Sequence, residues 1–128
     1  MINGVHLLLN SRDPEADRAF LRDVLGWPFV DAGHGWLIFA LPPTELAVHP
    51  SDAKPVEQEA GHGLVSAVVY LLCDNLHSTV ESLGAKGVVC TAIEEARWGV
   101  TTTFPLPGGG SLGLYEPHHP LAITPSAA

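Results

Sequence analysis

The chain has 128 residues, of which 46% are hydrophobic and 16% are charged, and its formal net charge is −8 at pH 7. This composition is typical of one globular domain that can bury a core, and it argues against a disordered chain. Only six residues are lysine or arginine. The sequence therefore excludes the basic surface with which proteins bind a nucleic-acid backbone or an anionic membrane.

No targeting or membrane signal stands out in the chain. No apolar run approaches the roughly 20 residues of a membrane-spanning helix. The first residues do not combine a basic region with an apolar stretch, so we expect a cytoplasmic protein. Two cysteines, Cys73 and Cys90, are too few for a disulfide framework, and we expect free thiols.

The first half of the chain predicts a strand, a helix and three further strands. Residues 5–10 form the first expected strand. Asp13 can cap a helix, Pro14 suits its first turn, and Gly26 is a stop signal. The apolar residues of this helix recur every four positions, which gives it one apolar face. The three expected strands that follow span residues 28–31, 35–41 and 45–49.

The second half of the chain repeats this order after a polar linker at about residues 51–63. Residues 64–73 are rich in β-branched side chains and predict a strand. Asp74 can cap a second helix, and Gly84 and Gly87 are stop signals. Three more strands are expected at residues 88–92, 100–105 and 111–116.

The two halves, about residues 1–52 and 62–120, thus carry the same pattern within a single domain spanning residues 1–128. When the two helix caps are aligned, His6 lies opposite Ala67. When the last strands are aligned by their following prolines, His49 lies opposite Glu116.

This doubled unit resembles the vicinal oxygen chelate superfamily, which includes glyoxalase I, extradiol dioxygenases, fosfomycin-resistance enzymes and bleomycin-binding proteins. The resemblance covers roughly residues 2–117. It rests on His6 in the first strand, the segment Phe-Leu-Arg-Asp-Val-Leu-Gly-Trp at residues 20–27, and Tyr-Glu-Pro at residues 115–117. It implies an α+β, glyoxalase-like fold in which two βαβββ modules form cupped mixed sheets around a pocket.

In this superfamily the metal ligands come from the first and last strands of each module. The resemblance therefore implies His6, His49 and Glu116 as ligands, with Glu45 as the alternative to His49. The internal alignment favours His49, whereas the family's frequent Glu-Leu near this strand favours Glu45. Two imidazoles and one carboxylate can hold Zn, Fe, Ni or Mn. Relatives usually have histidine at the remaining position, where this chain has Ala67.

The implied ligand residues and Ala67 are compatible with two functions. The chain could be a divalent-metal-dependent lyase or dioxygenase of the glyoxalase or dioxygenase kind, with Glu116 as a ligand that also moves protons. Alternatively, it is a metal-free protein that binds or sequesters a small molecule, as bleomycin-resistance proteins do. Ala67 favours this second reading. His6 would then be a core histidine hydrogen-bonded to Glu116.

The expected partner is a small-molecule ligand in an apolar pocket with a few polar anchors. The candidate wall residues, which are equally compatible with an ordinary core, are Trp36, Phe39, Trp98 and Tyr115, together with Phe104. His118 and His119 are expected in a solvated tail. We also expect a homodimer, because many relatives pair their modules and sheet edges need cover.

Overall fold

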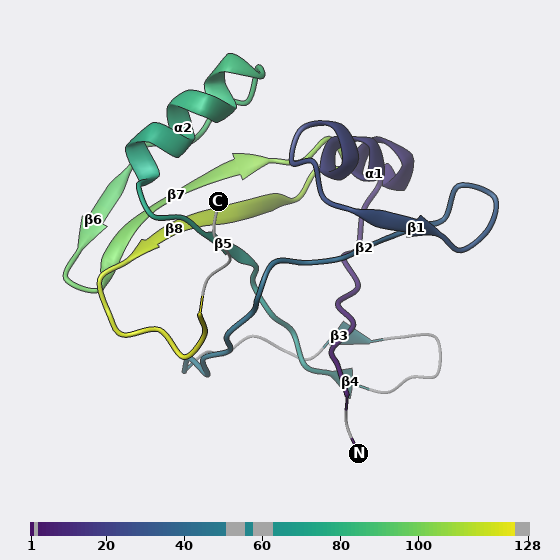
Figure 1. Cartoon of the computed structure of the whole chain (residues 1–128), viewed down its shortest axis with the longest axis horizontal. Helices are drawn as coiled ribbons and strands as arrows, with labels where there is room; N and C mark the ends of the chain where they lie inside the picture. Colours follow the sequence, from purple (N-terminus) through teal and green to yellow (C-terminus); the bar gives the residue numbers. More distant parts are fainter. Residues whose placement is uncertain (2, 51–55, 58–62, 125–128) are drawn as a thin grey trace. The chain divides into compact units, whose positions relative to one another are not determined.

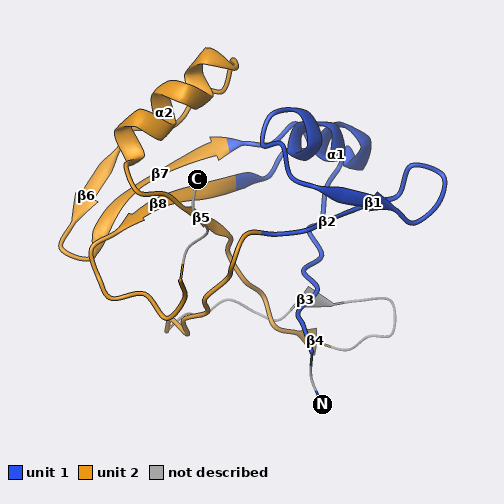
Figure 2. Cartoon of the chain, in the orientation of Figure 1, with its two compact units in different colours: residues 1–41, 105–111 blue, residues 42–104, 112–128 orange. Residues whose placement is uncertain are grey.

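The computed structural model describes residues 1, 3–50, 56–57 and 63–124 (Figure 1). Two helices and eight short strands are assigned among them, which confirms the α+β class. The chain divides into two compact units (Figure 2). Unit 1 comprises residues 1–41 and 105–111, and unit 2 comprises residues 42–104 and 112–128. Neither helix in the described part of the chain has the length and hydropathy needed to cross a membrane.

Unit 1 begins with helix α1, Pro14–Asp23, where the sequence predicts it. The carboxylate of Asp13 accepts a hydrogen bond from the backbone N–H of Ala16 at 3.1 Å, as an N-cap residue should. Pro14 occupies the first turn. Gly26 has a φ of +69°, a left-handed conformation that favours glycine and takes the chain out of the helix.

A hairpin follows in unit 1. Strand β1, Phe29–Asp31, pairs antiparallel with β2, Leu37–Phe39, so that Val30 lies opposite Ile38. Both strands are shorter than predicted. In the connecting turn, Asp31 Oδ1 accepts a hydrogen bond from the N–H of Gly33 at 2.7 Å.

The loop at residues 105–111 also belongs to unit 1. The N–H of Gly108 donates to Asp17 Oδ1 at 2.7 Å, and the carbonyl of Gly108 accepts from the N–H of Arg12 at 3.2 Å. A side chain at position 108 would overlap Ser11 and Asp17, so this close approach requires glycine. The loop is thereby fixed to the beginning of α1.

Unit 2 contains one complete βαβββ module, as the sequence predicts. Its four-stranded sheet has the order β5-β8-β7-β6, in which β5 and β8 are parallel while β6 and β7 are antiparallel (Figure 1). The strands are β5, Tyr70–Leu72; β6, Glu94–Ala96; β7, Gly99–Pro105; and β8, Ser111–Pro117. Alternate residues of β7 are buried, and the buried apolar residues of this unit are Leu76, Leu83, Val88, Val100, Phe104, Leu112 and Leu114. Phe104 is thus a core residue.

Helix α2, Leu76–Ala85, follows β5 in the chain. Strands β6 and β7 come next, and β8 then pairs parallel with β5. The cap of α2 is Asn75, so the prediction of Asp74 is wrong by one residue. Asn75 has the extended backbone of an N-cap (φ −140°, ψ 107°), and its Oδ1 accepts a hydrogen bond from the N–H of Ser78 at 2.9 Å. Aspartate and asparagine both suit an N-cap, so the sequence alone could not choose between Asp74 and Asn75.

Three expected strands are not formed, namely those at residues 5–10, 45–49 and 88–92. The strand expected at 64–73 is interrupted: Gly63–Leu64 forms β4, which pairs with β3, Val56–Glu57, and β5 starts only at Tyr70. A strand needs a partner for its backbone groups, and apolar patterning does not supply one.

The segment 88–92 shows what replaces a regular strand. The N–H of Thr91 donates to the carbonyl of Thr103 at 2.8 Å, and the Thr91 hydroxyl accepts from the N–H of Thr103 at 2.9 Å. The Thr102 hydroxyl donates to the carbonyl of Thr91 at 2.6 Å. Threonine hydroxyls thus compete with the backbone for the hydrogen bonds of a regular sheet.

Candidate functional site

The predicted site residues are divided between the two units. His6, Trp36 and Phe39 belong to unit 1, whereas Glu45, His49, Trp98, Tyr115 and Glu116 belong to unit 2. His6 lies in a segment without regular secondary structure, and its residue is exposed. Unit 2 therefore carries the larger part of the candidate site.

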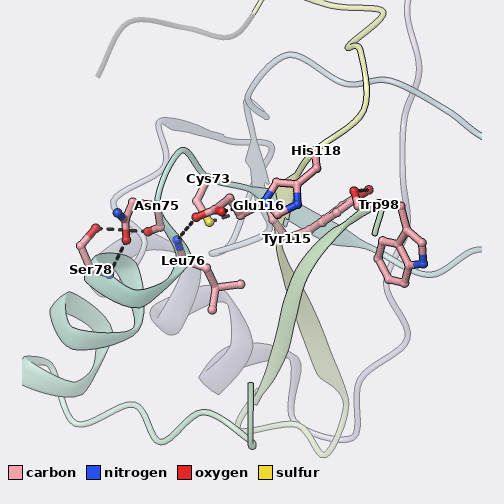
Figure 3. Close-up of polar contacts among 8 residues, drawn as sticks. All are labelled: Cys73, Asn75, Leu76, Ser78, Trp98, Tyr115, Glu116 and His118. Carbon is pink, nitrogen blue, oxygen red and sulfur yellow. Dashed lines mark hydrogen bonds and ion pairs between the residues drawn. The ribbon is translucent and has the colours of Figure 1, made fainter. Parts of the chain in front are cut away.

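Glu116 lies near the end of β8, and both oxygens of its carboxylate have partners (Figure 3). Oε1 accepts a hydrogen bond from the N–H of Leu76, the first residue of α2, at 2.9 Å. Oε2 lies 3.1 Å from His118 Nε2. The bond from Leu76 and then the contact with His118 lower the pKa of Glu116. An ionised carboxylate at this place stabilises the helix, because the N-terminus of a helix favours negative charge.

His118 is exposed just beyond β8, as expected of a residue in a solvated tail, but two contacts hold it in place. Its ring contacts Glu116, and its backbone N–H donates to the carbonyl of Trp98 at 2.9 Å. The residue lies just beyond β8, where this backbone hydrogen bond fixes its position. Glu116 thus has the histidine partner that a partly buried carboxylate requires, but the partner comes from its own strand end.

Glu45 and His49, the two alternatives for one ligand position, have different surroundings. His49 is exposed, and its Nδ1 donates to the carbonyl of Pro50 at 2.7 Å. Glu45 is half-buried, and its Oε1 has no hydrogen-bond partner among the described residues although solvent does not reach that atom. The two residues lie in a segment that is not a strand, although a strand was predicted at residues 45–49.

Aromatic rings gather around Tyr115 on the same unit. The ring centre of Tyr115 lies 5.6 Å from that of Trp98, at an interplanar angle of 78°, and 6.0 Å from that of Tyr70, at 70°. The imidazole of His119 lies 5.6 Å away. Edge-to-face pairs of this kind are favourable. We call these residues the Tyr115 cluster: Tyr70, Trp98, Tyr115 and His119.

Two glycines make room for the Tyr115 cluster. Gly113 lies opposite Tyr70 in the parallel pair of β5 and β8, and a side chain there would overlap the Tyr70 ring. A side chain at Gly99 would overlap the ring of Tyr115. The close packing of the rings against the backbone therefore depends on glycine at both positions. The sequence reasoning singled out Trp98 and Tyr115 but missed Tyr70 and His119.

Tyr115 is held as a neutral hydrogen-bond donor. Its hydroxyl donates to the carbonyl of Trp98 at 3.0 Å (Figure 3). Burial, and then the negative charge of Glu45, raise the pKa of Tyr115.

A resident divalent metal needs several donor side chains in one place. Among the described residues of either unit, no three histidine, cysteine, aspartate or glutamate side chains are grouped so that they could hold one. Glu116 is already engaged by Leu76 and His118. Cys73 is a free thiol whose pKa is raised, chiefly by burial, and Cys90 is also free. A thiol of raised pKa is a poor metal ligand.

Comparison with known proteins identifies a family. A model of the Glyoxalase/Bleomycin resistance protein/Dioxygenase superfamily matches residues 5–120. No curated protein sequence matches the chain.

Several solved structures share the glyoxalase fold at low sequence identity. TnmS3, an antibiotic binding protein from Streptomyces sp. CB03234, is 18% identical with a TM-score of 0.54, over 91% of this chain and 97% of TnmS3. Lactoylglutathione lyase from Agrobacterium tumefaciens is 18% identical with a TM-score of 0.56, over 89% of this chain and 92% of the lyase. An integron cassette protein from the mobile metagenome of V. Cholerae is 21% identical with a TM-score of 0.53, and the match covers 91% of this chain and 98% of the cassette protein.

Proposed function

Because the chain belongs to the Glyoxalase/Bleomycin resistance protein/Dioxygenase superfamily, we propose that it handles a small organic molecule and binds it without a resident divalent metal. The superfamily and the fold support the first half of this proposal. The fold itself hosts unrelated chemistries, so the choice between them must come from the residues of the site.

The engagement of Glu116 carries the metal-free half of the proposal. The resemblance implies Glu116 as a metal ligand outright, whereas it implies Glu45 only as an alternative to His49. The two oxygens of Glu116 bind the N–H of Leu76 and the imidazole of His118. A metal at Glu116 would share these oxygens with the N–H of Leu76 and the imidazole of His118, and its charge would weaken both contacts. Ala67, at the position where relatives usually have histidine, removes a further ligand.

Metal analysis of the full chain, purified without a histidine tag or chelator, tests this proposal. We expect far less than one equivalent of Zn, Fe, Ni or Mn, and no heat of binding when these ions are titrated into the protein. A library of small organic molecules should nevertheless yield ligands that raise the melting temperature. Close to one equivalent of metal, lost in both His6→Ala and Glu116→Gln, would contradict the proposal.

A metal-dependent lyase or dioxygenase that uses His6, His49 and Glu116 is the second candidate, with Glu45 as the alternative to His49. The ionised state of Glu116 favours it, since a ligand carboxylate must be deprotonated. Lactoylglutathione lyase, which shares the fold, is named as a lyase. If this candidate holds, bound metal should weaken the hydrogen bond from Leu76 to Glu116, and amide hydrogen exchange in the first turn of α2 should accelerate.

A further inference from the structure

The turn at residues 105–111 connects two strands of unit 2 but belongs to unit 1 (Figure 2). The chain passes from one unit to the other at residues 41–42, 104–105 and 111–112. The second of these crossings lies within β7 and the third lies within β8. The two strands carry buried apolar residues of unit 2, namely Val100, Phe104, Leu112 and Leu114. The turn is therefore joined covalently to strands that the core of unit 2 holds in place.

Unit 1 has few buried residues apart from this turn. Among its described residues, only Leu106 and Gly108 are buried, and both lie in the turn. None of the ten residues of α1 is buried, and the three residues of β1 are exposed. A single short helix and a two-stranded hairpin are each marginal on their own. The stability of α1 should therefore depend on its contacts with residues 105–111.

Those contacts are hydrogen bonds between Gly108 and the beginning of α1. The N–H of Gly108 donates to Asp17 Oδ1 at 2.7 Å, and its carbonyl accepts from the N–H of Arg12 at 3.2 Å. The turn also has a hydrogen bond of its own, from the N–H of Leu106 to the carbonyl of Gly110 at 2.7 Å. We call the three residues that join the turn to the helix the Gly108 clasp: Arg12, Asp17 and Gly108.

We propose that the Gly108 clasp is a conformational device that controls the opening of unit 1. While its hydrogen bonds are formed, α1 is held to a turn that β7 and β8 keep in place. When they break, α1 opens although unit 2 stays folded. Proteins open in local cooperative units of this kind, each with its own free energy. The clasp acts without any ligand or metal, so it is independent of the proposed small-molecule function.

Amide hydrogen exchange in the full chain, followed by NMR under native conditions, measures the opening of each unit separately. The reporter for unit 1 is the N–H of Val24, which donates to the carbonyl of Phe20 at the end of α1 at 2.9 Å. The reporter for unit 2 is the N–H of Cys73, which donates to the carbonyl of Tyr115 at 2.9 Å. Because Tyr115 belongs to the candidate site, the second reporter also shows whether the site stays intact.

Substitutions at Asp17 test the acceptor of the clasp. Asp17→Ala leaves the buried N–H of Gly108 without its acceptor, so exchange at Val24 should accelerate about tenfold while exchange at Cys73 stays unchanged. Asp17→Asn keeps a side-chain oxygen and should exchange at close to the parent rate. Glu15→Ala is the matched control, because it removes an exposed carboxylate from the same first turn of α1, and its effect should be much smaller.

Two glycines of the turn test the same contact from the other side. A side chain at position 108 would overlap Ser11 and Asp17, whereas nothing lies within 4 Å of one added at position 110. Gly108→Ala should therefore accelerate exchange at Val24 as Asp17→Ala does. Gly110→Ala, which makes the same chemical change in the same turn, should not.

Three results would overturn the inference. The first is unchanged exchange at Val24 in either Asp17→Ala or Gly108→Ala. The second is an equal acceleration at Val24 and Cys73, because the turn would then support the whole protein and not unit 1 in particular. The third is an acceleration in Gly110→Ala as large as that in Gly108→Ala, since the close approach at position 108 would then not matter.

Discussion

Glu116 joins the end of β8 to the beginning of α2 through one ionised side chain. The N–H of Leu76 and the ring of His118 both favour the charged carboxylate, and charge on His77 acts in the same direction. The pKa of Glu116 in the folded protein is therefore below its ordinary value of 4.5. Such a group stabilises the folded state above its unfolded pKa, and this contribution is lost as the pH falls through its folded pKa.

We predict that Glu116→Gln lowers the free energy of unfolding at pH 7 and that the deficit shrinks below about pH 4.5. Above that pH, the parent protein has a stabilising charge that the variant lacks. Below it, the parent carboxylate is progressively protonated and the two proteins become alike. Urea unfolding followed by circular dichroism at pH 7 and at about pH 3 measures the difference. Glu95→Gln is the matched control, and a deficit that is equal at both pH values would refute this account.

At the scale of single residues, the sequence predicted which side chains belong to the candidate site better than it predicted their hydrogen-bond partners. The resemblance implied Glu116 as a metal ligand, and it left Glu45 as the alternative to His49, which the internal alignment favoured. The partner of Glu116 depends on the backbone bond that joins His118 to Trp98, a contact between β8 and the turn before β7. No pattern within a short stretch of sequence encodes this contact. The preference of a helix N-terminus for a negative charge is general, but it does not say which distant carboxylate supplies that charge.

At the scale of secondary structure, the two helices were predicted well because their signals are local. Asp13, Pro14 and fourfold apolar spacing are contained within a dozen residues, and α1 begins where they indicate. Strands depend on distant partners, so residues 5–10 and 45–49 carry strand-like composition without forming strands. Unit 2 contains one complete βαβββ module, whereas the first half of the chain forms only α1, β1 and β2, so the repeat of the module stays a prediction. The predicted boundaries of the two halves remain a prediction.

The beginning of α2 provides a test of this element. We predict that Asn75→Ala lowers the free energy of unfolding by about 1 kcal/mol, because the N–H of Ser78 loses its acceptor. Asp74→Ala is the matched control and should have little effect, since the neighbouring Asn75 is the cap. Chemical unfolding of the three proteins in parallel gives the result. A larger loss in Asp74→Ala than in Asn75→Ala would show that the helix begins one residue earlier.

At the scale of the whole molecule, a strongly acidic chain also exposes large apolar side chains. The net charge is −8, yet several valine and leucine residues in the segments 5–9, 46–48 and 65–68 are largely exposed. Val65 is 91% exposed and Val68 is 82% exposed. Apolar surface of this extent is usually covered in solution, whereas the like charges of two copies oppose their association.

We therefore predict a homodimer whose stability increases with salt. Light scattering at tens of micromolar protein should give about twice the monomer mass of 13.6 kDa. Added NaCl should tighten the dimer, because it screens the repulsion between two copies of net charge −8 and leaves the burial of apolar surface intact. Val68→Glu should weaken association, whereas Val89→Glu, at a valine that is 79% exposed outside these segments, should not. A monomer mass for the parent protein at both low and high salt would refute the prediction, since neither charge repulsion nor its screening would then control the assembly.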